Sequence, residues 1–210
     1  MFQIKTKIKW PRFLPMWILS IVFGWSLIIY PGLSLREIVI YSWDMLPSIA
    51  WKMLISALML GTVIGILQYL AFRIEINLSW KWIFISALSY GISTPLAFLI
   101  LSAVIGYQEV FSSGGVAFMS LPLALTMLIG GCFAGIIQAY FLRVAFDLHR
   151  IRQIVLWTLG TGLSWGIGFF LTSYGKAVGL PLFMQSGLAG LAIGLITAFL
   201  LRIQFNRIPS

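Results

Sequence analysis

One short pattern occurs three times in this chain, and its spacing constrains the fold more than any other feature. Two glycines four residues apart are followed, three residues later, by Gln or Thr, and five residues after that by Arg. The three copies occupy 61–73, 131–143 and 190–202. Recurrence at a fixed spacing indicates a repeated architecture, in which one structural unit is used several times.

The composition around these copies is that of a membrane protein. Of 210 residues, 60% are hydrophobic and only 9% are charged, whereas soluble domains carry about 25% charged residues. A helix needs about 20 apolar residues to cross a bilayer. Six stretches meet that length: 14–32, 48–72, 82–104, 119–142, 154–174 and 181–201. The predicted fold is therefore all-α, a polytopic membrane protein with a single integral membrane domain over residues 1–210.

The basic residues predict how this domain is oriented. Eleven of the fourteen Lys and Arg residues lie at one predicted edge of the membrane, and only Arg36, Lys52 and Lys176 lie at the other. Basic residues favour the cytoplasmic side, so both termini are predicted to be cytoplasmic. Three helical hairpins then share one orientation, over 14–73, 82–143 and 154–202. The net charge of +9 is explained by this edge, so we expect membrane lipids as partners and no nucleic acid.

The repeated residues have a physical role in such hairpins. Glycines at i and i+4 lie on one helical face, where they let two helices approach closely in lipid, and polar side chains hydrogen-bond across the contact. The predicted helix-packing residues are Gly61, Gly65, Gly131, Gly135, Gly190 and Gly194. The predicted intramembrane polar contacts are Gln68, Gln138 and Thr197. The basic residues predicted at the cytoplasmic interface are Arg73, Arg143 and Arg202.

The first, third and fifth stretches share a looser pattern. Each has a Trp near its cytoplasmic end, and a second aromatic residue follows eight positions later, namely Trp25, Tyr90 or Trp165. These second aromatics either fill the core or the lipid-facing surface, or they form a wall for a lipid, a carotenoid or another ring-shaped ligand. Ser86 and Ser164 offer hydroxyl groups, either to a neighbouring helix or to a ligand.

These patterns resemble a loose group of six-span bacterial membrane proteins that is frequent in cyanobacteria and Chloroflexi. The resemblance covers residues 61–73, 82–91, 131–143, 157–166 and 190–202. The chain departs from that group at Tyr69 and Ala139, where Trp is frequent, and at Thr197, where Gln is usual. The resemblance implies the six-span architecture and a location in the bacterial plasma membrane, or in a thylakoid membrane if the source is cyanobacterial. It implies no activity.

The residues offer little for catalysis. The five acidic residues fall in predicted loops or interfaces, and the chain has one histidine and one cysteine, so neither a metal site nor bis-histidine haem is predicted. Ser164 lies in a G-x-S-x-G pattern in mid-helix, about 22 Å along a helix from His149, which is too far for a catalytic base. We expect no enzyme and no required cofactor, although a pigment or lipid could bind.

Two functions remain open from the sequence. The first is a non-enzymatic membrane subunit or scaffold that packs within the bilayer, in a complex with other membrane proteins. The second is a membrane protein that binds a small molecule, a pigment or a lipid, or that is a component of a transporter. A polar cavity shared by Gln68, Gln138, Ser86 and Ser164 would favour the second.

Overall fold

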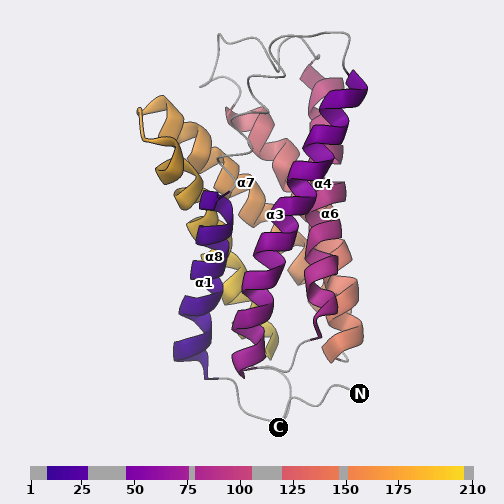
Figure 1. The fold of residues 1–210 in the computed structure, drawn as a ribbon, viewed down its shortest axis with the longest axis vertical. Helices are drawn as coiled ribbons and strands as arrows, with labels where there is room; N and C mark the ends of the chain where they lie inside the picture. The colour runs from indigo at the N-terminus through magenta and orange to yellow at the C-terminus, as the bar shows by residue number, and fades with distance from the viewer. Residues whose placement is uncertain (1–8, 28–45, 76–78, 106–119, 147–150, 206–210) are drawn as a thin grey trace.

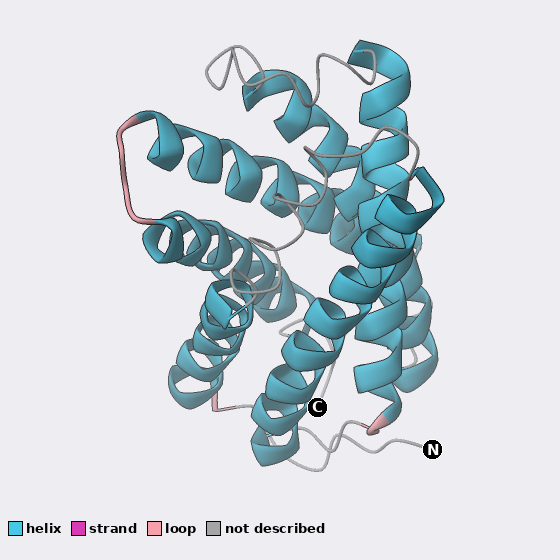
Figure 2. Cartoon of the chain, turned by 45° about the horizontal axis from the view of Figure 1, so that its top comes forward, coloured by secondary structure: helices cyan, strands magenta, loops and turns pink. Residues whose placement is uncertain are grey.

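The fold is all-helical over the residues that the computed structural model describes, which are 9–27, 46–75, 79–105, 120–146 and 151–205. Within these ranges the helices are α1 (Trp10–Leu27), α3 (Leu46–Glu75), α4 (Lys81–Ile105), α6 (Ser120–Phe146), α7 (Ile151–Ala177) and α8 (Leu182–Phe205). Each overlaps one of the six predicted apolar stretches over most of its length, and helix is the dominant element in Figure 2. The all-α prediction is therefore confirmed.

Three of these helices are long and apolar enough to cross a membrane. Their apolar segments are Ala124–Arg143 in α6, Ile151–Ala177 in α7 and Phe183–Ile203 in α8. A shorter apolar segment, Ala57–Arg73, lies in α3. The prediction of a membrane protein with transmembrane helices is supported by these segments.

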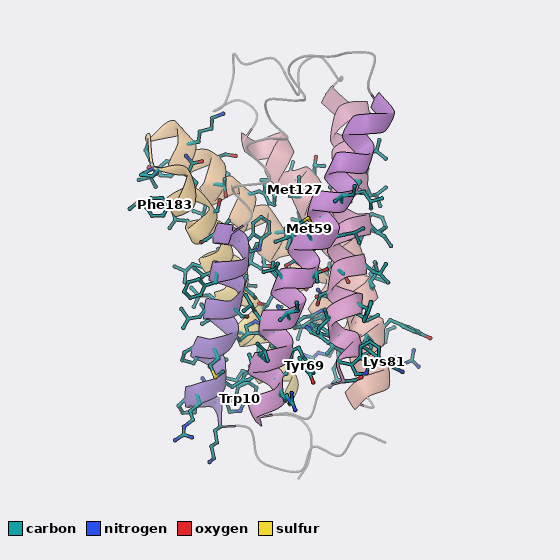
Figure 3. The ribbon with its side chains drawn as sticks, in the orientation of Figure 1. Trp10, Met59, Tyr69, Lys81, Met127 and Phe183 are labelled. Carbon is teal, nitrogen blue, oxygen red and sulfur yellow. The ribbon has the colours of Figure 1, made fainter. Side chains whose placement is uncertain are left out.

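The helices pack in a closed ring. Each helix contacts the next one along the chain, and α8 packs back against α1. The first helix begins and the last helix ends at the same end of the bundle (Figure 1). Figure 3 places Trp10, Tyr69 and Lys81 at this end, which we call the Lys81 end, and Phe183 toward the opposite end.

The surface of the bundle suits lipid rather than water. Along α7, the side chains of Leu159, Leu163, Ile167 and Phe170 are all exposed, at steps of three or four residues that keep them on one helical face. The other helices carry similar exposed rows, with Phe23, Met59, Phe84, Phe133 and Phe199 among their members. A continuous apolar surface of this extent is unusual in a soluble monomer.

Aromatic side chains fill the centre of the ring. Trp17, Trp82 and Trp157, the first aromatics of the odd-numbered stretches, are each at most 2% exposed. Phe72 packs edge-on against both Trp17 and Trp82, with ring centroids 5.0 and 5.7 Å apart. The residue that precedes each repeated arginine, which is Phe72, Leu142 or Leu201, is also fully buried. Equivalent positions of the three repeated patterns thus form the same core.

The connection between α7 and α8 is a tight turn that needs a glycine. Gly179 has a φ of +75°, in the left-handed region that other residues avoid. The amide of Leu180 donates to the Gly175 carbonyl at 2.9 Å, and the amide of Gly179 donates to Lys176 at 3.1 Å. This bonding pattern is a Schellman motif, which satisfies carbonyl groups at the end of α7.

Candidate functional site: the glycine seams and the aromatic axis

The repeated glycines lie where one hairpin meets the next. We call these contacts seams: α3 with α4, α6 with α7, and α8 with α1. A Cβ atom built on Gly61 would lie 2.5 Å from the Ser86 carbonyl oxygen, and one on Gly131 would lie 2.8 Å from that of Thr161. A Cβ on Gly190 would lie 2.8 Å from the Cα of Val22. Since real Cβ atoms essentially never come within 3.0 Å of other heavy atoms, a side chain at these positions would force the backbones apart.

The three seams also share one register. A Cβ on Gly65, Gly135 or Gly194 would lie 2.8–3.1 Å from the Cα of the residue that follows the first Trp of the facing helix. Those facing residues are Ile83, Thr158 and Ile18. The last seam therefore joins α8 to α1 by the contacts that join the consecutive hairpins.

The seam between α6 and α7 has glycines on both helices. A Cβ on Gly162 would meet the Sγ of Cys132 and would lie 2.8 Å from the Leu128 carbonyl oxygen, and one on Gly166 would lie 3.1 Å from the Ala124 carbonyl oxygen. Ser164, between these glycines, donates its hydroxyl to the Thr161 carbonyl of its own helix at 2.8 Å. The G-x-S-x-G pattern thus supplies packing contacts.

Two seams are closed by a hydrogen bond from an indole N–H. Trp82 Nε1 donates to Gln68 Oε1 at 3.0 Å, and Trp17 Nε1 donates to Thr197 Oγ1 at 2.9 Å. All four side chains are buried, so each bond satisfies groups that would be costly to leave unpaired in lipid. Sequence reasoning named Gln68 and Thr197 but missed their tryptophan partners. The sequence did indicate this pairing, because each repeat has one first Trp and one Gln or Thr at corresponding positions.

The third seam lacks this bond. Gln138 holds the position of Gln68 and Thr197 and is buried, yet Trp157 Nε1 has no hydrogen-bond partner among the described residues. The hydroxyls of Thr158 and Thr161 on the same helix are also buried without a partner within that part of the chain. Ser86 Oγ, in the α3–α4 seam, is likewise buried with no hydrogen-bond partner among the described residues.

The second aromatics meet at the axis of the ring. The ring centroids of Trp25 and Tyr90 are 6.5 Å apart, those of Trp25 and Trp165 are 6.4 Å apart, and those of Tyr90 and Trp165 are 4.9 Å apart. All three side chains are at most 9% exposed. They therefore pack against one another in the core, in the tilted and edge-on geometries that aromatic pairs favour, and they do not lie on the lipid-facing surface.

The repeated arginines lie on the surface. Arg73, Arg143 and Arg202 are in the last turns of α3, α6 and α8, and all three are exposed. Cations in the last turn of a helix interact favourably with its carbonyl end.

The described residues contain no group of three or more His, Cys, Asp or Glu side chains that could hold a metal ion. Several residues of the sequence analysis lie outside the described part, namely Arg36, Glu37, Asp44, Glu109, Asp147 and His149. The four polar residues whose shared cavity would favour a ligand-binding role are divided between two seams: Gln68 and Ser86 at α3–α4, and Gln138 and Ser164 at α6–α7. Of these, Gln68 and Ser164 make hydrogen bonds within the protein.

Comparison with known proteins adds no relative: no protein-family model, curated protein or solved structure matches the chain.

Proposed function

We propose that this chain is a six-span membrane protein built from three hairpin repeats, with both termini in the cytoplasm, and that it acts as a non-catalytic scaffold or subunit of a larger membrane complex. A bacterial plasma membrane, or a thylakoid membrane in a cyanobacterium, is the location that its resemblance favours. The observation that carries the proposal is that the repeated glycines, together with Gln68 and Thr197, make contacts between helices of this same chain.

The polar residues support a structural role. Gln68 and Thr197 accept hydrogen bonds from tryptophans at the seams, and Ser164 bonds to its own helix. Among the side chains whose burial the structure describes, a set that leaves out Lys52 and Glu75, no buried one carries a charge. Ion and proton pathways in membranes commonly depend on ionisable residues inside the bundle, so this interior is better suited to packing than to transport.

The filled axis supports the same role. Trp25, Tyr90 and Trp165 occupy the centre of the ring at one level, and Trp17 and Trp82 pack around Phe72 toward the Lys81 end. Large rings in mutual contact make a rigid core. A rigid core with an apolar exterior is a suitable frame for other membrane proteins to pack against.

Binding of a small molecule, pigment or lipid is the second candidate. It is favoured by two buried polar atoms that have no hydrogen-bond partner within the described part of the chain, Trp25 Nε1 and Ser93 Oγ, on side chains that are 9% and 0% exposed. A ring-shaped ligand with one polar substituent would match an indole N–H beside aromatic faces.

Purification in mild detergent separates the two candidates. The tagged chain is extracted, its absorption spectrum is recorded, and co-purifying proteins and small molecules are identified by mass spectrometry. A stoichiometric protein partner without a retained small molecule is the expected result. A retained pigment or lipid-like molecule with no protein partner would refute the scaffold role and support the ligand-binding role.

The orientation is tested separately with single cysteines in a Cys132→Ala background. Lys176 and Arg152 are both exposed and lie near opposite ends of α7. Lys176→Cys should react with an impermeant maleimide in intact cells, whereas Arg152→Cys should react only after the membrane is permeabilised. The reverse pattern would refute the proposed topology.

A further inference from the structure

We propose that the seam between α6 and α7 holds a buried water molecule, bound by Trp157, Thr158 and Thr161 beside Gln138. This site goes beyond the proposed function and does not depend on it. The three side chains bring a tryptophan N–H and two hydroxyls to one turn of α7, and all three polar atoms are buried without a partner among the described residues.

The shared register of the seams locates the site. At the other seams the indole N–H reaches Gln68 or Thr197 directly, at 3.0 and 2.9 Å. At the α6–α7 seam, Trp157 and Gln138 hold the same two positions and are 2% and 5% exposed. The donor and the acceptor are both in place, and the direct bond between them is not made.

One residue of α7 beside this pair, Thr158, is polar where both of its counterparts are apolar. Thr158 holds the position of Ile18 and Ile83 at the other seams, and Thr161 holds that of Ile21 and Ser86. A Cβ on Gly135 would lie 2.8 Å from the Cα of Thr158 and 3.1 Å from the Cβ of Thr161, so both threonines flank the same glycine of α6. Both threonines therefore lie at the contact with α6, beside Gly135.

Neither threonine uses the bond that hydroxyls usually make inside a helix. Thr62, Ser89 and Thr172 each donate to the carbonyl four residues earlier, at 2.7, 2.6 and 3.0 Å. This local bond is the ordinary way to satisfy a hydroxyl within a helix. Thr158 and Thr161 do not make it, although both oxygens are buried, so their partner has to come from outside their own helix.

The chemistry of the site fits water better than any other ligand. A buried water makes about three hydrogen bonds, with a range of about two to four, and the indole N–H, the two hydroxyls and the Gln138 amide supply that number of donors and acceptors. Trp157, Thr158, Thr161 and Gln138 are all uncharged, so these side chains offer nothing to balance an ion.

The test is water-selective NMR of the indole N–H groups in the full chain, labelled with ¹⁵N-tryptophan and held in detergent micelles or nanodiscs. The nine tryptophans are assigned by single Trp→Phe substitutions. We expect a cross-peak between water and the Hε1 proton of Trp157, and none for Trp17 or Trp82, which serve as internal controls. A density map should then show a peak about 2.7–3.2 Å from Trp157 Nε1.

Other outcomes overturn the proposal. A contact from Trp157 Hε1 to the Gln138 amide without a water signal would mean that the seam closes directly, like the other two. Water signals at all three indoles would mean general solvent access and no specific site. Thr158→Val with Thr161→Val should abolish the water signal at Trp157 and leave the Trp17 and Trp82 resonances in place. A signal that persists in this double variant would show that the hydroxyls do not hold the water, and if the variant fails to fold, the wild-type spectrum and the density map decide.

Discussion

The substitution Gly131→Ala tests whether the seams hold the bundle together. A Cβ at this position would lie 2.8 Å from the Thr161 carbonyl oxygen and 2.8 Å from both Cβ and Cγ of Trp165. None of these atoms is the free end of a flexible side chain, and Trp165 is only 1% exposed. To accept the methyl group, α6 and α7 have to move apart.

Two opposing contributions set the change in the free energy of unfolding that Gly131→Ala should cause. Overpacking a well-packed core costs about 1–3 kcal/mol, while Ala in place of Gly inside a helix contributes about 0.5–1 kcal/mol of stability. The expected net loss is roughly 1–2 kcal/mol. Gly187→Ala in α8 is the matched control, because the nearest atom to its Cβ would be Ser26 Oγ at 3.8 Å, an ordinary contact. Gly187→Ala has the favourable effect of Ala in a helix without the overpacking. It should therefore be more stable than the wild type by about 0.5–1 kcal/mol.

The assay is thermal unfolding in one detergent, followed by tryptophan fluorescence. The two variants should differ by about 2 kcal/mol, and for a chain of this size 1 kcal/mol moves the melting temperature by about 2–4 °C. Gly131→Ala should therefore melt roughly 4–8 °C below Gly187→Ala. Equal melting temperatures would mean that the two helices separate without cost, and the seam would then not be a stabilising contact.

Two further substitutions test the indole bond and the turn. Trp82→Phe should destabilise the chain by about 1–3 kcal/mol, because it leaves Gln68 buried and unpaired, and adding Gln68→Leu should restore part of the loss in the same melting assay. If the double variant is no more stable than the single one, the loss comes from packing rather than from the hydrogen bond. Gly179→Ala should cost about 1–2 kcal/mol through its left-handed backbone alone, since no atom lies within 4 Å of the added Cβ. A melting temperature equal to that of Gly187→Ala would show that the turn carries no such constraint.

The sequence was sufficient to predict the helices. Apolar stretches of about 20 residues mark the helices by length and composition alone, and each observed helix overlaps one predicted stretch over most of its length. α1 is described as far as Leu27, and the predicted end of its stretch at residue 32 falls among residues 28–45, outside the described part. The connections between the first and second and between the third and fourth predicted stretches, roughly 33–47 and 105–118, also lie mostly outside the described residues.

The sequence could not identify which helices the repeated residues contact. Glycines at i and i+4, such as Gly61 and Gly65, define one face of their own helix, but nothing in that spacing says whether the face meets the same hairpin or the next one. The structure places it on the next hairpin. For the same reason, the pattern at Trp25, Tyr90 and Trp165 could not show that these side chains meet, because their contact depends on the closure of the ring.

The closure of the ring has a consequence for synthesis. The hydrogen bond between Trp17 and Thr197 joins residues 180 positions apart, and Gly190 and Gly194 of α8 cover the face of α1 that carries Val22 and Ile18. A ribosome delivers α1 well before α8. Until α8 is inserted, α1 has only α3 as a neighbour in the ring, and its other contact face is open to lipid or to the insertion machinery. The ring therefore closes only after α8 has been made, and a chain that stops before α8 leaves α1 half packed.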